Sequence, residues 1–308
     1  MAQTFGITLN QVLMMFIFLL IGYFAKKGKL LNDSAGGVIS NLLVWVFLPA
    51  MCFNTFATQF NITSLIKNIN FVIIGAFVMI FEIALGFLWA KLMTKDKFER
   101  GVYAYTVMFP NYTYFGYPLI LALYGEEWLY YAMMFMLVGN IVCYVLGFYI
   151  LDPTKTKLSF KSLLNPPIVA TAVGIVFGIF GIKLPKVMST AVQNAQNCMA
   201  PMSMILAGYV LSSLPLKKAF TNVRVYLTLF VRMVFIPFCT ALVLYLLGFD
   251  KTVIIISAGM MAMPAGLNSI VVPASKGLNS TLGACIALIS NVAALIITPV
   301  AFMILAMI

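Results

Sequence analysis

Histidine is absent from this chain of 308 residues, and only 9% of its residues are charged. The missing histidine removes the commonest general base and the commonest metal ligand. Paired carboxylates within apolar segments and a glycine-rich nucleotide-binding motif are also missing from the sequence. We therefore expect neither enzyme activity nor a bound cofactor.

Cysteine is too sparse to build a site. Each cysteine stands alone within an apolar segment, at Cys52, Cys143, Cys198, Cys239 and Cys285. This spacing favours neither a disulfide framework nor a CxxC metal site, so we expect no metal. The net charge is +11, but no basic patch is interleaved with exposed aromatic residues, so we expect no nucleic-acid partner.

Apolar sequence is what the chain has in abundance, since 63% of its residues are hydrophobic. A membrane span takes about 20 mostly apolar residues, so the chain has room for about ten spans in contact with membrane lipid. No run shows the alternation of a barrel strand, which predicts an all-α polytopic membrane protein. The predicted spans are residues 8–25, 39–57, 70–90, 101–124, 128–151, 166–181, 189–214, 223–247, 252–275 and 280–306.

The basic residues divide unequally between the two sides that these spans define. Fourteen of the 19 Lys and Arg residues fall on one side, only Lys67, Lys183, Lys186 and Lys251 fall on the other, and Arg232 lies inside a span. The richer side is predicted to be cytoplasmic, which places both termini outside the cytoplasm of a cell-membrane protein. Glu126 and Glu127 are then expected to be solvated residues of an outer loop.

The longest internal connector falls after five of these spans and divides the chain into similar halves. We expect a first five-helix repeat at residues 1–152, a cytoplasmic connector at 153–165 and a second repeat at 166–308. Because five is odd, the second repeat must cross the membrane upside down relative to the first. This is the arrangement of an inverted-repeat transporter.

Two spans in corresponding places of the halves carry helix-breaking residues near their middle. The first reads "FPNYTYFGYPLILALYG" (residues 109–125) and contains Pro110, Asn111, Gly116 and Pro118. The second reads "MAMPAGLNSIVVPASKG" (residues 261–277) and contains Pro264, Gly266, Asn268 and Pro273. Each proline ends one half-helix and starts another, and exposed backbone at this depth is tolerated only where it lines a cavity.

The half-helices that follow the two breaks both begin near the membrane midplane. Their positive dipole ends then point at one central region, where free amide groups suit an anionic group such as a carboxylate. The unpaired carbonyls of the preceding halves can coordinate a cation. The predicted substrate-binding residues are Pro110, Asn111, Thr113, Gly116, Pro118, Pro264, Gly266, Asn268 and Ser269.

Glu82 and Arg232 are the ionisable groups that lie well inside apolar segments, apart from tyrosines and thiols. Charges at such positions are functional candidates. One hypothesis is that they form an ion pair, and another is that Glu82 is a proton site while Arg232 is a counter-ion for the substrate. A third interpretation is that Arg232 extends to the interface and has no role in transport.

These segments resemble the auxin efflux carrier family. "FPNYTYFGYPLILALYG" is similar to its fourth-helix signature, which reads approximately Pro-Asn, a short spacer, Gly-x-Pro-Leu and Ala-x-Tyr-Gly. "IGYFAKKGKLL" and "ISNLLVWVFLPAMCF" resemble its first and second helices, and "MPAGLNSIVVPASKG" its ninth. The large cytoplasmic loop of the long plant members is absent, so the chain is similar to the compact bacterial members, often assigned to malate, malonate or related carboxylates.

The resemblance implies a ten-helix fold of two inverted five-helix repeats, assembled as a homodimer. Helices one, two, six and seven would form a scaffold and the rest a moving unit, with helices four and nine crossing at Pro110, Asn111 and Pro264. The run of Tyr112, Tyr114 and Tyr117 departs from the family pattern, so the identity of the substrate does not follow from the resemblance.

We expect a secondary active or facilitative transporter that moves a small mono- or dicarboxylate by alternating access, with H⁺ or Na⁺ as possible coupling ions. One alternative is an exporter of aromatic weak acids such as indole carboxylates, which the tyrosines would permit. An alternative of another class is a channel or a membrane sensor without turnover.

Overall fold

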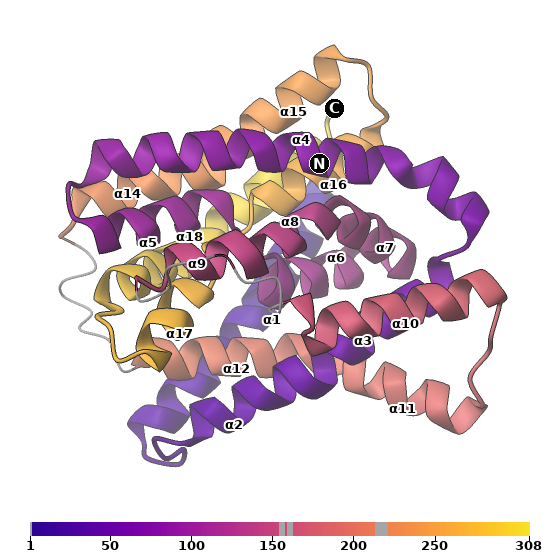
Figure 1. The fold of residues 1–308 in the computed structure, drawn as a ribbon, viewed down its shortest axis with the longest axis horizontal. Coiled ribbons are helices and arrows are strands. Elements are labelled where there is room, and N and C mark those ends of the chain that lie inside the picture. The colour runs from indigo at the N-terminus through magenta and orange to yellow at the C-terminus, as the bar shows by residue number, and fades with distance from the viewer. Residues whose placement is uncertain (1, 154–157, 159–162, 213–220) are drawn as a thin grey trace.

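The computed structural model describes residues 2–153, 158, 163–212 and 221–308, and this part of the chain is built from helices without strands (Figure 1). The η elements are π-helical turns. The helices are α1 (Ala2–Lys27), α2 (Ala35–Leu42), η1 (Leu43–Phe47), α3 (Leu48–Gln59), α4 (Ile62–Met93), α5 (Lys97–Met108), η2 (Tyr112–Gly116), α6 (Tyr117–Tyr124), α7 (Glu126–Phe135), α8 (Leu137–Val142), η3 (Cys143–Gly147), α9 (Phe148–Ile150), α10 (Pro166–Phe180), α11 (Lys186–Asn197), α12 (Met199–Ser212), α14 (Val223–Phe230), η5 (Val231–Phe235), α15 (Ile236–Leu246), α16 (Lys251–Met261), α17 (Asn268–Ser275) and α18 (Thr281–Leu305).

Several helices are long and apolar enough to cross a membrane. Five meet this condition within the described residues, and a sixth does so if α7 and the helix from Leu137 to Ile150, which meet at a bend of 53°, count as one span. α10 and α16 are shorter apolar helices. The chain is therefore an all-helical, multi-pass membrane protein, and its division into ten spans stays a prediction. Of the predicted connector at 153–165, residues 154–157 and 159–162 lie outside the described part.

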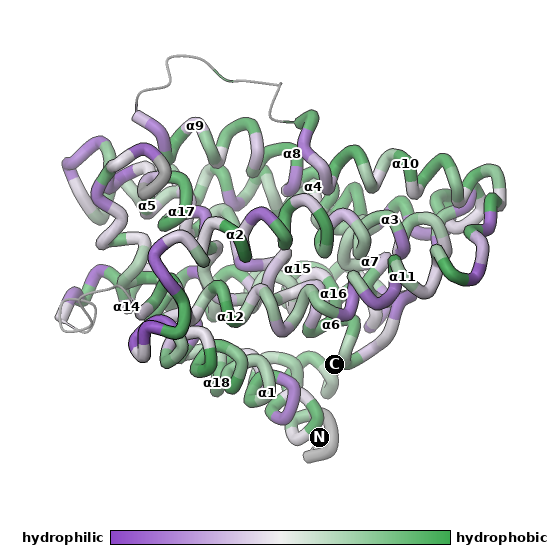
Figure 2. The backbone as a smooth tube through the Cα atoms, turned by 90° about the horizontal axis from the view of Figure 1, so that it is seen from below, coloured by the Kyte–Doolittle hydropathy of each residue, from purple (hydrophilic) through white to green (hydrophobic). Residues whose placement is uncertain are grey.

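The outer surface of the helices is apolar, as a lipid-facing surface must be. Phe77 and Ile80 of α4 are 69% and 64% exposed, and Trp45 of η1 is 68% exposed. Figure 2 shows that hydrophobic residues dominate the helices while hydrophilic residues are more frequent at the turns. Water would disfavour so much exposed apolar area, whereas lipid does not.

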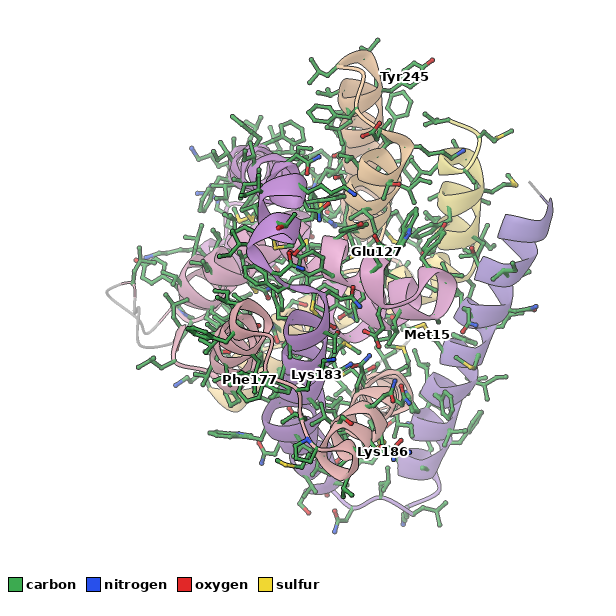
Figure 3. All side chains as sticks on the ribbon, turned by 90° about the vertical axis from the view of Figure 1, so that its right-hand side faces the viewer. Met15, Glu127, Phe177, Lys183, Lys186 and Tyr245 are labelled. Carbon is green, nitrogen blue, oxygen red and sulfur yellow. The ribbon has the colours of Figure 1, made fainter. Side chains whose placement is uncertain are left out.

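The turns gather at two opposite ends of the molecule. The turn between α4 and α5 and the start of α14 lie at the left of Figure 1, while the α3–α4 and α10–α11 turns lie at its right. Figure 3 looks onto this right-hand end, which carries Lys183 and Lys186 at the α10–α11 turn. The helices thus run from an end whose turns are rich in lysine and arginine to one that has few.

One group of helices consists of α1, α2–α3, α10 and α11–α12, in which α1 packs along α12 and α10 packs along α3, while α1 also packs along α18 outside this group. Glycines allow the backbones of α1 and α12 to touch, because a Cβ on Gly208 would lie 1.8 Å from the Leu19 carbonyl oxygen. Close backbone approach at small residues is a common basis of helix association in lipid.

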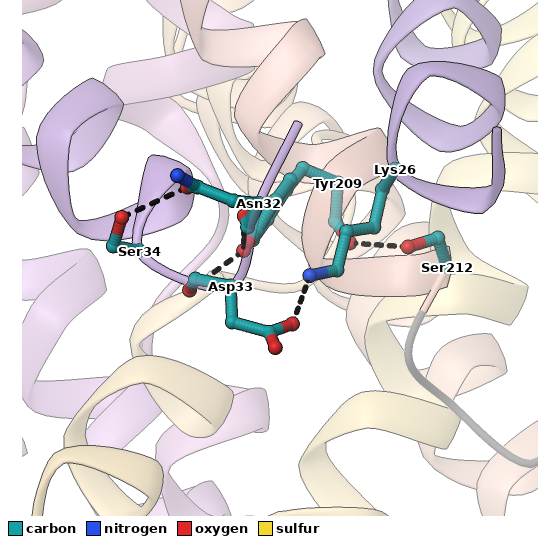
Figure 4. A network of polar contacts seen from close by, with 6 residues as sticks. All are labelled: Lys26, Asn32, Asp33, Ser34, Tyr209 and Ser212. Atoms are coloured by element: carbon teal, nitrogen blue, oxygen red, sulfur yellow. Dashed lines mark hydrogen bonds and ion pairs between the residues drawn. The ribbon is translucent and has the colours of Figure 1, made fainter. Parts of the chain in front are cut away.

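Polar contacts fix one end of this group (Figure 4). The Lys26 ammonium pairs with the Asp33 carboxylate and lies 4.9 Å above the ring of Tyr209 on α12. The Tyr209 hydroxyl donates to the carbonyls of Asn32 and Asp33 at 2.9 Å. The loop between α1 and α2 is therefore attached to α12.

The remaining helices form a second group in which α4 packs against α5 and α7, and α15 against α16. Glu126 and Glu127 form the first turn of α7 rather than a loop, and the predicted solvent exposure holds for Glu127 but not for Glu126. Glu127 is exposed, whereas Glu126 is partly buried and accepts a hydrogen bond from Gln196 at 2.7 Å. A carboxylate at a helix N-terminus is favoured by the helix dipole.

Candidate functional site

The two predicted breaks lie against each other. α5 ends at Met108, α16 ends at Met261, and the segments that follow pair as an isolated antiparallel bridge between Pro110 and Ala265. The Asn111 amide donates to the Pro264 carbonyl at 2.6 Å, and the Gly266 amide donates to the Phe109 carbonyl at 3.3 Å. Backbone groups that have no partner within their own broken helix are thus hydrogen-bonded to the other break.

Asn111 starts the helical segment that follows the first break. Its side-chain oxygen accepts from the Tyr114 amide at 3.3 Å, and its carbonyl accepts from the Phe115 and Gly116 amides at 3.1 and 3.0 Å. Because the oxygen is used as the helix cap, the orientation of the side-chain amide is fixed and its nitrogen is left as a donor. This nitrogen has no protein partner, although Asn111 is only 3% exposed.

The second break is arranged differently. The Ala265 amide donates to the Ser290 hydroxyl at 3.1 Å, and the Ser269 hydroxyl donates to the Gly266 carbonyl at 2.9 Å. Helix α17 then begins at Asn268, whose side chain interacts with Tyr105 and Cys143. The segment that follows Pro264 is thus held by hydroxyl groups rather than by an asparagine cap.

A cavity of about 500 Å³ opens at the crossing of the two breaks. No charged side chain borders it among the described residues. Three π-helical turns, η1, η2 and η3, contribute to its wall, and such turns are frequent at functional sites. Its lining residues are Ser40, Val44, Trp45, Leu48, Tyr105, Pro110, Asn111, Tyr112, Thr113, Tyr114, Cys143, Tyr144, Phe148, Leu164, Asn165, Pro166, Gly266, Leu267, Asn268, Val271 and Val272.

The predicted substrate-binding residues divide into two sets. Those that border the cavity are Pro110, Asn111, Thr113, Gly266 and Asn268. Those that lie behind it are Gly116, Pro118, Pro264 and Ser269.

The second set has structural contacts. A Cβ on Gly116 would lie 3.1 Å from the terminal methyl carbon of Met260, and Pro118 lies in the first turn of α6. Pro264 supplies the carbonyl of the bridge, and Ser269 is fully buried. These four residues shape the crossing without bordering the cavity.

Aromatic rings make up much of the cavity wall. The Tyr112 hydroxyl donates to the Asn140 side-chain oxygen at 2.8 Å, and the Tyr117 hydroxyl accepts from the Asn140 nitrogen at 3.3 Å. Tyr112 and Tyr114 line the cavity, whereas Tyr117 packs behind them.

Sequence reasoning missed several wall residues. They are Trp45, Tyr105, Cys143, Tyr144 and Asn165, which come from four other segments. The segments of the first four carry no cluster of proline, glycine and asparagine like those of the two breaks, whereas Asn165 directly precedes Pro166 and Pro167 and falls in the predicted connector.

Glu82 and Arg232 form an ion pair away from the cavity wall. Glu82 is 2% exposed and Arg232 is fully buried. The Arg232 guanidinium also donates to the Val107 carbonyl at 2.8 Å and to the Met261 carbonyl at 3.1 Å. The arginine therefore does not extend to the interface.

Part of the cavity wall adjoins connecting segments at one end of the bundle. Ser40 and Val44 follow the α1–α2 loop, and Asn165 starts α10 after the internal connector. On the other side of the crossing, the Asn54 amide donates to the Gln196 side-chain oxygen at 2.8 Å, and Gln196 donates to Glu126. These contacts join the first helix group to α7 of the second.

Comparison with known proteins agrees with this architecture. A family model described as membrane transport protein matches residues 7–162 and 153–302. An uncharacterized transporter of Methanocaldococcus jannaschii is 24% identical over 263 residues, which cover 82% of this chain and 85% of that protein. An uncharacterized transporter of Methanothermobacter thermautotrophicus is 20% identical over 301 residues, which cover 94% and 96%.

The family match and both relatives describe transporters rather than enzymes. The matched residues extend over nearly the whole chain, including both breaks and the cavity wall that they form. The chain therefore belongs to the membrane transport protein family, the auxin efflux carrier family that its broken helices resemble.

Proposed function

We propose that the protein is a secondary active or facilitative transporter that binds a small organic anion in the cavity at the crossing of the two breaks. The observation that carries the proposal is Asn111, which borders the cavity and whose buried side-chain nitrogen has no protein partner. A buried donor without a partner costs free energy, so a site that keeps one gains when a ligand accepts its hydrogen bond. The cavity volume of about 500 Å³ suits a small molecule.

The donors at the cavity suit a carboxylate. The helical segment that begins at Tyr112 directs its N-terminal end toward the cavity, and Asn111 and Asn268 add side-chain amides. Helix N-termini attract anions through free amides and the helix dipole. Burying a dianion in this cavity would cost more free energy than burying a monoanion, because no charged side chain is among the described residues that line it. A monocarboxylate is therefore favoured over a dicarboxylate.

The aromatic wall favours a second candidate within the same class. Trp45, Tyr105, Tyr112, Tyr114, Tyr144 and Phe148 provide ring faces and edges around the neutral donors. An aromatic weak acid, such as an indole carboxylate, would place its ring against these side chains and its carboxylate at Asn111. Small aliphatic monocarboxylates would use the same donors but leave much of the apolar wall uncovered.

We further propose that the two helix groups move relative to each other during alternating access. In this account, ten spans form two inverted repeats in the cell membrane, with both termini outside the cytoplasm. In this proposal the cavity is reached from the end that the basic residues mark as cytoplasmic, which Ser40 and Asn165 in its wall support, while the Asn54–Gln196–Glu126 contacts join the groups at the other end. Release of these contacts would accompany opening to the outside.

Counterflow in proteoliposomes tests this function without assuming a coupling ion. Vesicles loaded with malate, malonate, succinate, lactate or indole-3-acetate are diluted into the labelled form of the same anion. We expect saturable accumulation of a monocarboxylate, its loss in Asn111→Ala, and its retention in Asn61→Ala. Asn61 is a matched control because it also caps a helix, accepting from Ser64 at 2.7 Å, but is exposed and far from the cavity wall.

Two other outcomes would overturn the proposal. Flux that rises linearly with concentration and shows no counterflow would indicate a channel. Binding of an anion without any flux would indicate a sensor.

A further inference from the structure

Each of the two breaks frees several backbone carbonyls, and one pair of them lies at equivalent positions. In an uninterrupted helix the Val107 carbonyl would accept from the amide of Asn111, and the Met261 carbonyl from the amide of Ala265. The Asn111 amide instead donates to the Pro264 carbonyl, and the Ala265 amide to the Ser290 hydroxyl. Val107 and Met261 each lie three residues before the proline of their break.

One side chain accounts for both freed carbonyls. Within a single guanidinium, Nη1 of Arg232 donates to the Val107 oxygen at 2.8 Å and Nη2 donates to the Met261 oxygen at 3.1 Å. Carbonyls at a helix C-terminus carry partial negative charge, so a cation between two such ends is stabilised by both. Nη1 also pairs with the Glu82 carboxylate of α4.

Apart from the Met261 sulfur at 3.6 Å, the atoms that this guanidinium contacts are oxygens, which a small hard cation prefers. Two carbonyl oxygens from half-helix C-terminal ends and one carboxylate match the oxygen ligands that hold Na⁺ in transporters with broken helices. We infer that Arg232 is a tethered cation that occupies a latent sodium-type site formed by Val107, Met261 and Glu82. Removal of its side chain exposes this site to a free monovalent cation.

The cation site is separate from the cavity of the proposed anion site, since none of its residues borders that cavity. Arg232 does not border the cavity, whose wall includes the helix start at Asn111. Arg232 is thus a positioning residue that holds the pre-break half-helices together, rather than a counter-ion for the substrate. This role in transport rests on the proposed function, whereas the cation site itself can be tested without a substrate.

Thermal unfolding of purified protein in detergent tests the cation site. Arg232→Ala, wild type and the double variant Glu82→Gln/Arg232→Ala are heated in chloride salts of Na⁺, K⁺ or choline at one ionic strength. We expect Na⁺ to raise the midpoint of Arg232→Ala by at least about 2 °C over choline, because a ligand bound only by the folded state stabilises it. Wild type and the double variant should show no such rise, since the first keeps its tethered cation and the second has lost the carboxylate.

An equal Na⁺ response in wild type, or no response in Arg232→Ala, would overturn the inference. If Arg232→Ala cannot be purified, Arg232→Lys is used in its place. Lysine retains the tethered charge, so the thermal midpoint of Arg232→Lys should be the same in Na⁺ and in choline. A higher midpoint in Na⁺ would contradict the inference. Counterflow by wild type should likewise be unchanged when choline replaces Na⁺, and a Na⁺ requirement would overturn the tethered-cation role. Failure of every anion in counterflow would refute the proposed function but leave the thermal result intact.

Discussion

Replacement of Asn111 by aspartate separates the helix cap that its oxygen forms from the anion contact proposed for its nitrogen. Asn111→Asp keeps an oxygen that can accept from the Tyr114 amide, so the helix cap is preserved. It replaces the free amide nitrogen with a second oxygen and adds a negative charge at the cavity. We therefore expect weaker anion binding without a loss of folding.

The expected size of the effect follows from the lost hydrogen bond. A hydrogen bond to a charged group contributes about 1.5–3 kcal/mol, which corresponds to about a 10- to 100-fold change in affinity. Repulsion between the new carboxylate and a bound carboxylate adds to this, so the range is a lower limit. A protonated carboxyl can donate again, so part of the affinity should return as the pH falls.

The assay is the concentration dependence of counterflow for the anion that wild type exchanges best. The half-saturating concentration of Asn111→Asp should rise at least about 10-fold, while its thermal midpoint stays within about 2 °C of wild type because the cap is kept. Asn61→Asp, which changes an exposed helix cap in the same way, should alter neither quantity. An unchanged half-saturating concentration in Asn111→Asp would refute the assignment of its nitrogen to the anion.

Three further predictions concern stability. Glu82→Gln and Arg232→Met should each lower the free energy of unfolding by about 3–5 kcal/mol in detergent denaturation, because each change leaves one charge buried alone. The double variant should lose less than the sum of the two single losses. Losses that add strictly would argue against a coupled pair. Gly208→Val should abolish folded protein on size-exclusion chromatography by separating α12 from α1, whereas Gly37→Ala, which meets no atom within 4 Å, should elute like wild type. The hydrogen bond from the lysine ammonium of α1 lowers the pKa of Asp33 from 3.8. The stabilisation from this ion pair is therefore present above pH 3.8 and is lost as the pH falls through the lowered pKa of Asp33 in the folded protein. The thermal midpoints of wild type and Asp33→Asn should accordingly differ at neutral pH and converge in acid.

The crossing of the two breaks could be predicted because its cause is local. Proline removes an amide donor, and the same pattern around Pro110 and Pro264 recurs in both halves of the chain. The predicted inverted arrangement would bring the breaks to one depth. The ion pair of Glu82 and Arg232 could also be predicted as one of the stated alternatives, because charge in an apolar span needs a partner.

Other features depend on packing that no local pattern encodes. Tyr105 and Tyr144 reach the cavity through the rotation of α5 and η3, and tyrosine in a span is equally compatible with the lipid interface. The contacts of Arg232 with two freed carbonyls depend on the axial position of η5 beside α5 and α16. Glu126 was misassigned because its partner Gln196 is 70 residues away in the sequence.

The central claim is that an organic anion binds at the crossing, and the structure of the protein with its best counterflow anion tests it most directly. The account predicts ligand density in the cavity with a carboxylate oxygen within about 3 Å of the Asn111 side-chain nitrogen. The same soak or complex of Asn111→Asp should show an empty cavity. Density for the anion at another place in wild type, with the cavity empty, would contradict the account.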